Sequence, residues 1–137
     1  MKAVIDTNVF VESLSRTSPY HAIFQSLLHG KFSICVSNPI VLEYVEILYA
    51  LHRRENADRL FDFLSISPFV ILVDPTFHFN LITADPDDNK FVDCAVVANA
   101  DYIVTSDHHY DVLKDIPFPK VQIIHPEQFV ELLAVIF

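Results

Sequence analysis

Two short apolar runs that each lead into an aspartate constrain the fold of this chain most strongly. Residues 3–5 precede Asp6, and residues 102–106 precede Asp107. Continuous apolar runs of this length are typical of buried parallel strands, whose carboxyl ends meet at the sheet edge where α/β proteins build their sites. One such aspartate could be a helix cap. Two of them, each beside hydroxyl side chains, indicate a shared pocket.

The rest of the chain alternates between strand-like and helix-like segments, which predicts βαβ units around a parallel sheet. Strands are expected at residues 2–5, 32–36, 69–73, 102–104 and 121–124. Helices are expected at 8–14, 18–29, 37–54, 57–64, 88–98, 109–113 and from Pro126 onward, with an irregular connection at 75–84. Gly30 suits the end of the second helix, and Ser37 with Pro39 suits the start of the third. With no repeat or linker, residues 1–137 are expected to form a single domain.

The composition predicts a soluble, cytoplasmic protein without a membrane segment. The chain is 52% hydrophobic, yet no apolar run approaches the roughly 18 residues that span a bilayer. Asp6 would interrupt an apolar export segment, so the N-terminus does not resemble a signal peptide. Cys35 and Cys94 fall on a strand and on the apolar side of a helix, which predicts core positions. The high apolar content also predicts a homodimer.

The net charge of −9 argues against nucleic acid as a partner, because phosphate contacts need lysine and arginine. The excess is uneven, since residues 71–137 hold three basic and eleven acidic residues. Much of it surrounds the acidic positions discussed next, where bound cations would offset it. Arg53 and Arg54 lie close together near a helix end, where they form either a solvated face or, with Lys90, a surface for substrate contact.

A second acidic run, Asp85-Pro86-Asp87-Asp88-Asn89-Lys90, precedes a predicted helix. One acid is enough to cap that helix and complement its dipole. Three are more than capping needs, so Asp88 is predicted to bind metal, with Asp85 and Asp87 in the loop or in an outer shell. Asp93 lies opposite the apolar stripe of the helix and is expected to be exposed to solvent.

Glu43 and Glu46 both lie opposite the apolar stripe of their helix, and the pattern does not choose between them. Near Asp6, Thr7 and Asn8 can orient a carboxylate through hydrogen bonds. Thr105 and Ser106 offer hydroxyls before Asp107. A phosphatase with a nucleophilic Asp6 would need a second aspartate at position 8, where this chain has Asn8. That reading is therefore disfavoured.

Five segments, taken in order, resemble the PIN-domain family: V-I-D-T-N-V-F, S-N-P-I-V-L-E-Y, D-P-D-D-N-K-F-V-D-C-A, A-D-Y-I-V-T-S-D and I-I-H-P-E-Q-F. The resemblance implies a three-layer α/β/α fold with a five-stranded parallel sheet of order 3-2-1-4-5. It also implies a quartet of Asp6, Glu43, Asp88 and Asp107 that holds Mg²⁺ or Mn²⁺. Many family members are VapC-type toxin ribonucleases with an antitoxin partner, and homodimers are frequent. The D-P-D-D-N-K run is closer to a toxin-component branch than to the shortest toxins.

The leading hypothesis is a metal-dependent endoribonuclease that hydrolyses single-stranded RNA as the toxin of a type II toxin–antitoxin pair. Oxygen ligands favour Mg²⁺ or Mn²⁺ over Zn²⁺, and the sequence offers no Cys/His cage. With no lysine expected among them, the clustered carboxylates would repel one another without such a cation. His108, beside Asp107, is expected to be an exposed loop residue. The alternative is a catalytically inactive PIN-like module that binds protein or RNA.

Overall fold

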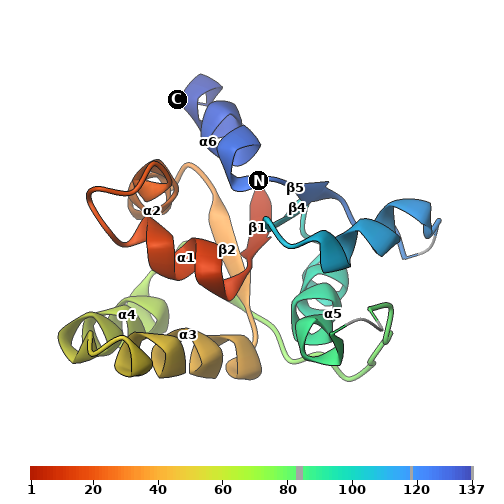
Figure 1. Ribbon diagram of the computed structural model, residues 1–137, viewed down its shortest axis with the longest axis horizontal. Coiled ribbons are helices and arrows are strands. Elements are labelled where there is room, and N and C mark those ends of the chain that lie inside the picture. The colour runs from red at the N-terminus through yellow and green to blue at the C-terminus, as the bar shows by residue number, and fades with distance from the viewer. Residues whose placement is uncertain (83–84, 118, 137) are drawn as a thin grey trace.

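A five-stranded, all-parallel sheet forms the centre of the computed structural model, which describes residues 1–82, 85–117 and 119–136 (Figure 1). The strands are β1 (Lys2–Ile5), β2 (Ser33–Val36), β3 (Val70–Leu72), β4 (Tyr102–Val104) and β5 (Ile123–Ile124). Their order is β3-β2-β1-β4-β5, which confirms the predicted topology. β1 is central and pairs with both β2 and β4. The chain therefore leaves the sheet at neighbouring points after β1 and β4.

Helices cover the sheet in the predicted three-layer α/β/α arrangement (Figure 1). They are α1 (Thr7–Ser13), α2 (His21–Leu28), α3 (Asn38–Ala50), α4 (Arg54–Ile66), α5 (Asn89–Ala98) and α6 (Pro126–Val135), with 3-10 turns η1 (Pro86–Asp88) and η2 (His108–Asp115). α5 packs on β1, β2 and β4, and α1 lies against α2 and α3. Within the described ranges, no helix has both the length and the apolar character needed to cross a membrane.

The central strands are buried on both faces, which explains why their sequences are apolar without alternation. Ala3, Val4 and Ile5 of β1 are fully buried. Cys35 and Cys94 are free, buried thiols, as predicted. Aromatic rings extend the core between helices, with the Phe10 and Tyr44 rings stacked and their centroids 4.6 Å apart. Each large apolar side chain buried here stabilises the fold by about 1.5–3 kcal/mol.

Helix ends account for the main differences from the sequence-based expectations. α3 ends at Ala50 rather than near Arg54, because His52 has a φ of 58° and the Arg53 N–H bonds to the Leu48 carbonyl at 2.8 Å. This left-handed closure ends the helix, and α4 begins directly after it. Phe61 of α4 is exposed.

Gly30 lies just past α2, as predicted, with a φ of 73°. A Cβ atom at this position would lie 2.6 Å from the Phe69 ring, so both backbone conformation and space require glycine. Ser37 occupies the N-cap position of α3, but its side chain makes no capping hydrogen bond. Pro39 lies in the first turn of that helix, as expected.

Candidate metal centre

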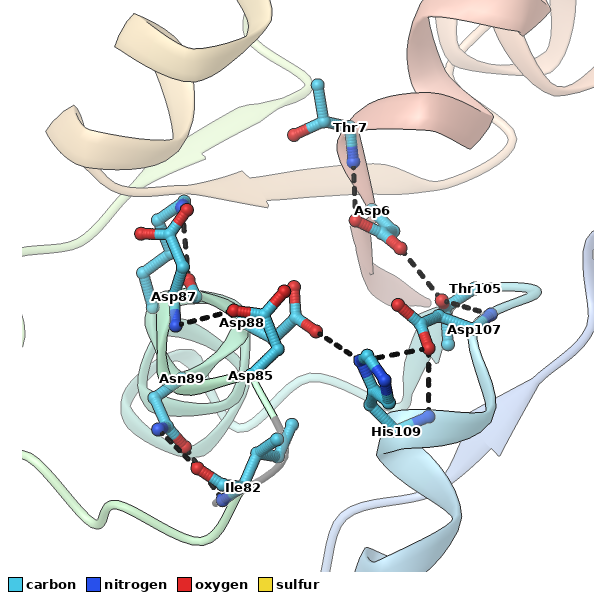
Figure 2. A network of polar contacts seen from close by, with 11 residues as sticks. Asp6, Thr7, Ile82, Asp85, Asp87, Asp88, Asn89, Thr105, Asp107 and His109 are labelled. Carbon is cyan, nitrogen blue, oxygen red and sulfur yellow. Dashed lines mark hydrogen bonds and ion pairs between the residues drawn. The ribbon is translucent and has the colours of Figure 1, made fainter.

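The first part of the site lies where β1 and β4 end side by side. Asp6 follows β1, and its N–H bonds to the Val104 carbonyl of β4 at 3.0 Å. Thr105 donates its hydroxyl to Asp6 Oδ2 at 2.8 Å and accepts the Asp107 N–H at 3.0 Å (Figure 2). The other Asp6 oxygen accepts the Thr7 N–H at 2.8 Å. One threonine thus joins the two aspartates predicted to share a pocket.

The second part of the site comes from the amino end of α5. Asp88 occupies the N-cap position, but its side chain makes no capping hydrogen bond, so helix capping does not explain this residue. Asp88 Oδ2 is buried and has no hydrogen-bond partner among the described residues. Burial, followed by the charges of Asp6, Asp85 and Asp107, raises the pKa of Asp88 to about 6. Burial likewise raises the pKa of Asp6, and Asp107 and Glu43 add to this effect.

Glu43, and not Glu46, faces this cluster. The Thr7 hydroxyl donates to Glu43 Oε2, whereas Glu46 is exposed. The next residue fixes the helix in place, because the buried Tyr44 hydroxyl donates to the Ile5 carbonyl at the end of β1. α3 is therefore anchored to the strand that carries Asp6. The helical pattern could not separate the two glutamates, because this anchor joins segments distant in the sequence.

A lysine lies among the carboxylates, which corrects the expectation that the cluster contains none. Lys90 Nζ lies 2.8 Å from Glu43 Oε1 and 3.3 Å from Asp87 Oδ2, and its side chain is only 16% exposed. Arg53 and Arg54, the other candidates for substrate contact, are exposed. Both lie past the end of α3, which carries Glu43: Arg53 precedes α4 and Arg54 begins it.

His109 also contacts the cluster, although the sequence drew attention only to its neighbour. His109 Nδ1 lies 3.3 Å from Asp107 Oδ1 and 3.5 Å from Asp88 Oδ2 (Figure 2). His108 is exposed, as expected, and contacts Asp111. The signal that could have found His109 is its position two residues after Asp107, where its N–H bonds to that carboxylate at 2.9 Å.

Asp93 is buried, so the prediction that it faces solvent was wrong. Its carboxylate accepts the Phe79 N–H at 3.0 Å and lies 3.1 Å from His78 Nδ1. Nearby, Asn89 exchanges two hydrogen bonds with the backbone of Ile82 (Figure 2). The connection before the acidic run therefore packs over the polar side of α5, a contact that helical periodicity does not reveal.

The two remaining predicted supporting residues lie outside this network. Asn8 and Ser106 are both exposed. Within residues 1–82, 85–117 and 119–136, neither side chain makes a hydrogen bond to the cluster. The hydroxyls of Thr7 and Thr105 are the ones that contact carboxylates of the site.

The residues present fit a divalent cation. The Oδ2 atom of Asp88 is buried and makes no hydrogen bond among the described residues, and its contact is the 3.5 Å approach of His109 Nδ1. A cation would satisfy this oxygen, because a carboxylate atom shielded from water is costly unless it is compensated. Asp85, Asp88 and His109 each offer a ligand atom, and these atoms lie within 4.8 Å of one another. Lys90 offsets only part of the negative charge, since Asp6 and Asp88 still raise the pKa of their neighbours.

The chain is similar to known proteins along most of its length. A family model described as PIN domain matches residues 2–109. The uncharacterized protein MJ1680 of Methanocaldococcus jannaschii is 28% identical over 142 residues, which cover 96% of this chain and 90% of that protein.

A solved structure shares the fold. A chain in the crystal structure of VapBC2 from Rickettsia felis, bound to a DNA fragment from their promoter, superposes with a TM-score of 0.63. The match covers 91% of this chain and 98% of that chain at 19% sequence identity.

Proposed function

The chain belongs to the PIN-domain family, and on that premise we propose that it is a divalent-metal-dependent endoribonuclease that hydrolyses single-stranded RNA. The observation that carries the proposal is the gathering of Asp6, Asp88 and Asp107 at one edge of the sheet, with Asp88 Oδ2 buried and approached at 3.5 Å by His109 but without a hydrogen bond among the described residues. Carboxylates in this arrangement favour a bound cation, because without one they repel each other.

Asp6, Asp88, Asp107 and Glu43 would hold Mg²⁺ or Mn²⁺, either directly or through water. When bound, such an ion lowers the pKa of its water and polarises the scissile phosphate. We expect products with a 3′-hydroxyl and a 5′-phosphate, since water rather than the ribose 2′-hydroxyl is the nucleophile.

The chain's own residues hold the carboxylates in fixed orientations. Thr105 and the Thr7 N–H each occupy one oxygen of Asp6, which leaves the remaining acceptor directions for a cation. Lys90 pairs with Glu43 at 2.8 Å and reduces repulsion on the α3 side of the cleft. Supporting contacts of this kind commonly change metal affinity or activity by about 10–100-fold when they are removed.

A protein partner belongs to the proposal. The solved neighbour is a VapBC2 assembly on promoter DNA, and by analogy this chain would be the toxin of a type II pair. A groove of about 900 Å³ lies away from the acidic cluster and is lined by Arg16, His21, His29 and Arg59 around Phe24 and Phe63. Its described lining contains no acidic residue, although the chain has 18 acids. It would suit an amphipathic, acidic segment of an antitoxin.

A homodimer is proposed as well, since apolar residues remain exposed on the helices. Leu42 and Tyr49 of α3 and Phe61 of α4 are 43–59% exposed.

A catalytically inactive binding module is the second candidate. The net charge of −9 favours this binding module. Lys90 favours it too, because its ammonium pairs with carboxylates and is not free to bind a phosphate.

Cleavage of single-stranded RNA by Asp6→Asn tests the nuclease proposal. This variant keeps the shape of the side chain but removes one ligand charge, so we expect cleavage in Mg²⁺ or Mn²⁺ to fall by on the order of 10³-fold. Asp62→Asn, an exposed position on α4, is the matched control and should cleave like the parent. Equal cleavage by Asp6→Asn and the parent would establish a contaminating nuclease and favour the binding module.

A further inference from the structure

An imidazole lies among the carboxylates of the metal centre, and it affects which cation the centre fits. His109 Nδ1 is 3.3 Å from Asp107 Oδ1 and 3.5 Å from Asp88 Oδ2. Figure 2 shows the ring between these two carboxylates, close to Asp85. Adjacent ligands of one ion, each about 2.1 Å from it, lie about 3 Å apart in an octahedral sphere. The observed spacings therefore suit neighbouring positions around a single ion.

The local fold selects His109 over its neighbour. The His109 N–H bonds to Asp107 Oδ1 at 2.9 Å at the start of η2, which places this ring beside the cluster. The His108 side chain is 94% exposed and lies 3.2 Å from Asp111 Oδ2. Two adjacent histidines thus have different surroundings, and one serves as a natural control for the other.

Two buried polar atoms near this ring have no hydrogen-bond partner in the described part of the chain. They are Asp88 Oδ2 and the hydroxyl of Tyr110. Tyr110 follows His109 and is fully buried. Burial raises the pKa of its hydroxyl, and the charges of all four quartet carboxylates add to this effect, so the hydroxyl lies within their field. A buried polar atom without a hydrogen bond is costly, and a cation beside His109 would satisfy Asp88 Oδ2, which lies 3.5 Å from that ring.

The carboxylates of the cluster differ in the positive charge beside them. The Lys90 ammonium of α5 bonds to Glu43 and lies 3.3 Å from Asp87 Oδ2. On the side of Asp85 and Asp88, the described residues supply the imidazole of His109, with ligand atoms within 4.8 Å of one another. A cation is therefore needed most where a nitrogen ligand is available.

We propose that Asp85, Asp88 and His109 Nδ1 hold a first-row transition-metal ion in preference to Mg²⁺. This inference rests on the proposed function, because it specifies the cation of the same centre. Imidazole is a good ligand for transition metals, whereas Mg²⁺ is bound by carboxylates, phosphates and its own waters. Asp85, expected in the loop or an outer shell, becomes a ligand, and the oxygen-only donor set expected from the sequence gains one nitrogen.

Electron spin-echo spectroscopy of the Mn²⁺-loaded, full-length protein tests this assignment, because it detects ¹⁴N directly bonded to the ion. The parent and His108→Gln should both show nitrogen coupling, and His109→Gln should lose it. Calorimetry should show that the parent binds Mn²⁺ at least about tenfold more tightly than Mg²⁺. His109→Gln should lose most of this preference, with its far-ultraviolet circular dichroism unchanged.

Three outcomes overturn the assignment: no nitrogen coupling in the parent, coupling that persists in His109→Gln, or no Mn²⁺ binding. RNA cleavage, measured on the same samples, separates this inference from the nuclease proposal. Nitrogen coupling without cleavage supports the imidazole ligand and contradicts the nuclease. Cleavage without coupling contradicts the ligand and supports the nuclease.

Discussion

The two sides of the acidic cluster are built differently. On the sheet side, the Asp6 carboxylate accepts from the Thr105 hydroxyl and the Thr7 N–H, and the Asp107 carboxylate accepts the His109 N–H, all neutral donors. On the α5 side the contacts are ionic: Lys90 pairs with Glu43 and Asp87, and the His109 ring lies 3.5 Å from Asp88 Oδ2 and reaches Asp107 Oδ1 on the sheet side at 3.3 Å. Neutral donors fix carboxylates at any cation concentration, whereas ionic contacts change with pH, salt and metal.

This difference indicates a division of work. The sheet side is preorganised before a cation binds, because its hydrogen bonds belong to the folded backbone. The α5 side needs positive charge to be stable, since burial raises the pKa of Asp88 to about 6. Substitutions on each side, and a change of pH, should therefore have different effects.

Thr105→Val should disrupt the hydrogen bonds of the sheet side. The substitution keeps the shape of a 3% exposed side chain and removes the two hydrogen bonds that join Asp6 and Asp107. We expect RNA cleavage to fall by about 10–100-fold and the free energy of unfolding to fall by about 1–3 kcal/mol, as measured by urea unfolding. Because the lost donor is neutral, added Mn²⁺ should not restore the stability. Full restoration by Mn²⁺ would show that this side also depends on cations.

Lys90→Met should destabilise the α5 side, and bound metal should restore its stability. Removing the ammonium leaves Glu43 without its 2.8 Å partner, so the free energy of unfolding in a chelator should fall by about 1–3 kcal/mol. Millimolar Mn²⁺ should stabilise this variant more than it stabilises the parent, because stabilisation grows with affinity for the folded state. Lys114→Met, whose side chain is 66% exposed, is the control. An equal Mn²⁺ effect on parent and Lys90→Met would contradict the division.

The pH dependence of stability should isolate Asp88. Its folded pKa of about 6 lies above its ordinary value of 3.8, so the folded state binds the proton more tightly than the unfolded state does. The free energy of unfolding should therefore fall as pH rises from about 4 to 6 in a chelator, and then level off. Asp88→Asn should remove the contribution of Asp88 and leave that of Asp6, whose pKa burial also raises, so the variant's stability advantage over the parent should grow across that interval. Asp62→Asn should retain the parent's decline. An advantage that does not change with pH would contradict the raised pKa.

The sequence predicted the sheet side of the site better than the α5 side. Asp6 and Asp107 follow apolar strands, and strand pairing alone brings them together, so local pattern was sufficient. Glu43 required knowledge of the Tyr44 anchor to β1, which spans 39 positions. Asp93 was misplaced because the connection that covers it has no periodic signal.

The ionic contacts were the least predictable. Lys90 appeared in the sequence only as a candidate for substrate contact, and its pairing with Glu43 spans 47 positions. His109 contacts Asp88 from a different element, η2. Such pairs depend on how α3, α5 and η2 are positioned relative to one another on the sheet. The residue pattern within each element does not predict those positions. The strand order was predicted through the family resemblance and was confirmed.

A crystal of the protein soaked in Mn²⁺, with diffraction measured near the manganese absorption edge, tests the central claim most directly. We expect an anomalous peak in the acidic cluster, about 2.1–2.2 Å from Asp88 Oδ2 and on the side that faces Asp6 and Asp107. A cleft without such a peak at millimolar Mn²⁺, or a peak only at other carboxylates, would contradict it.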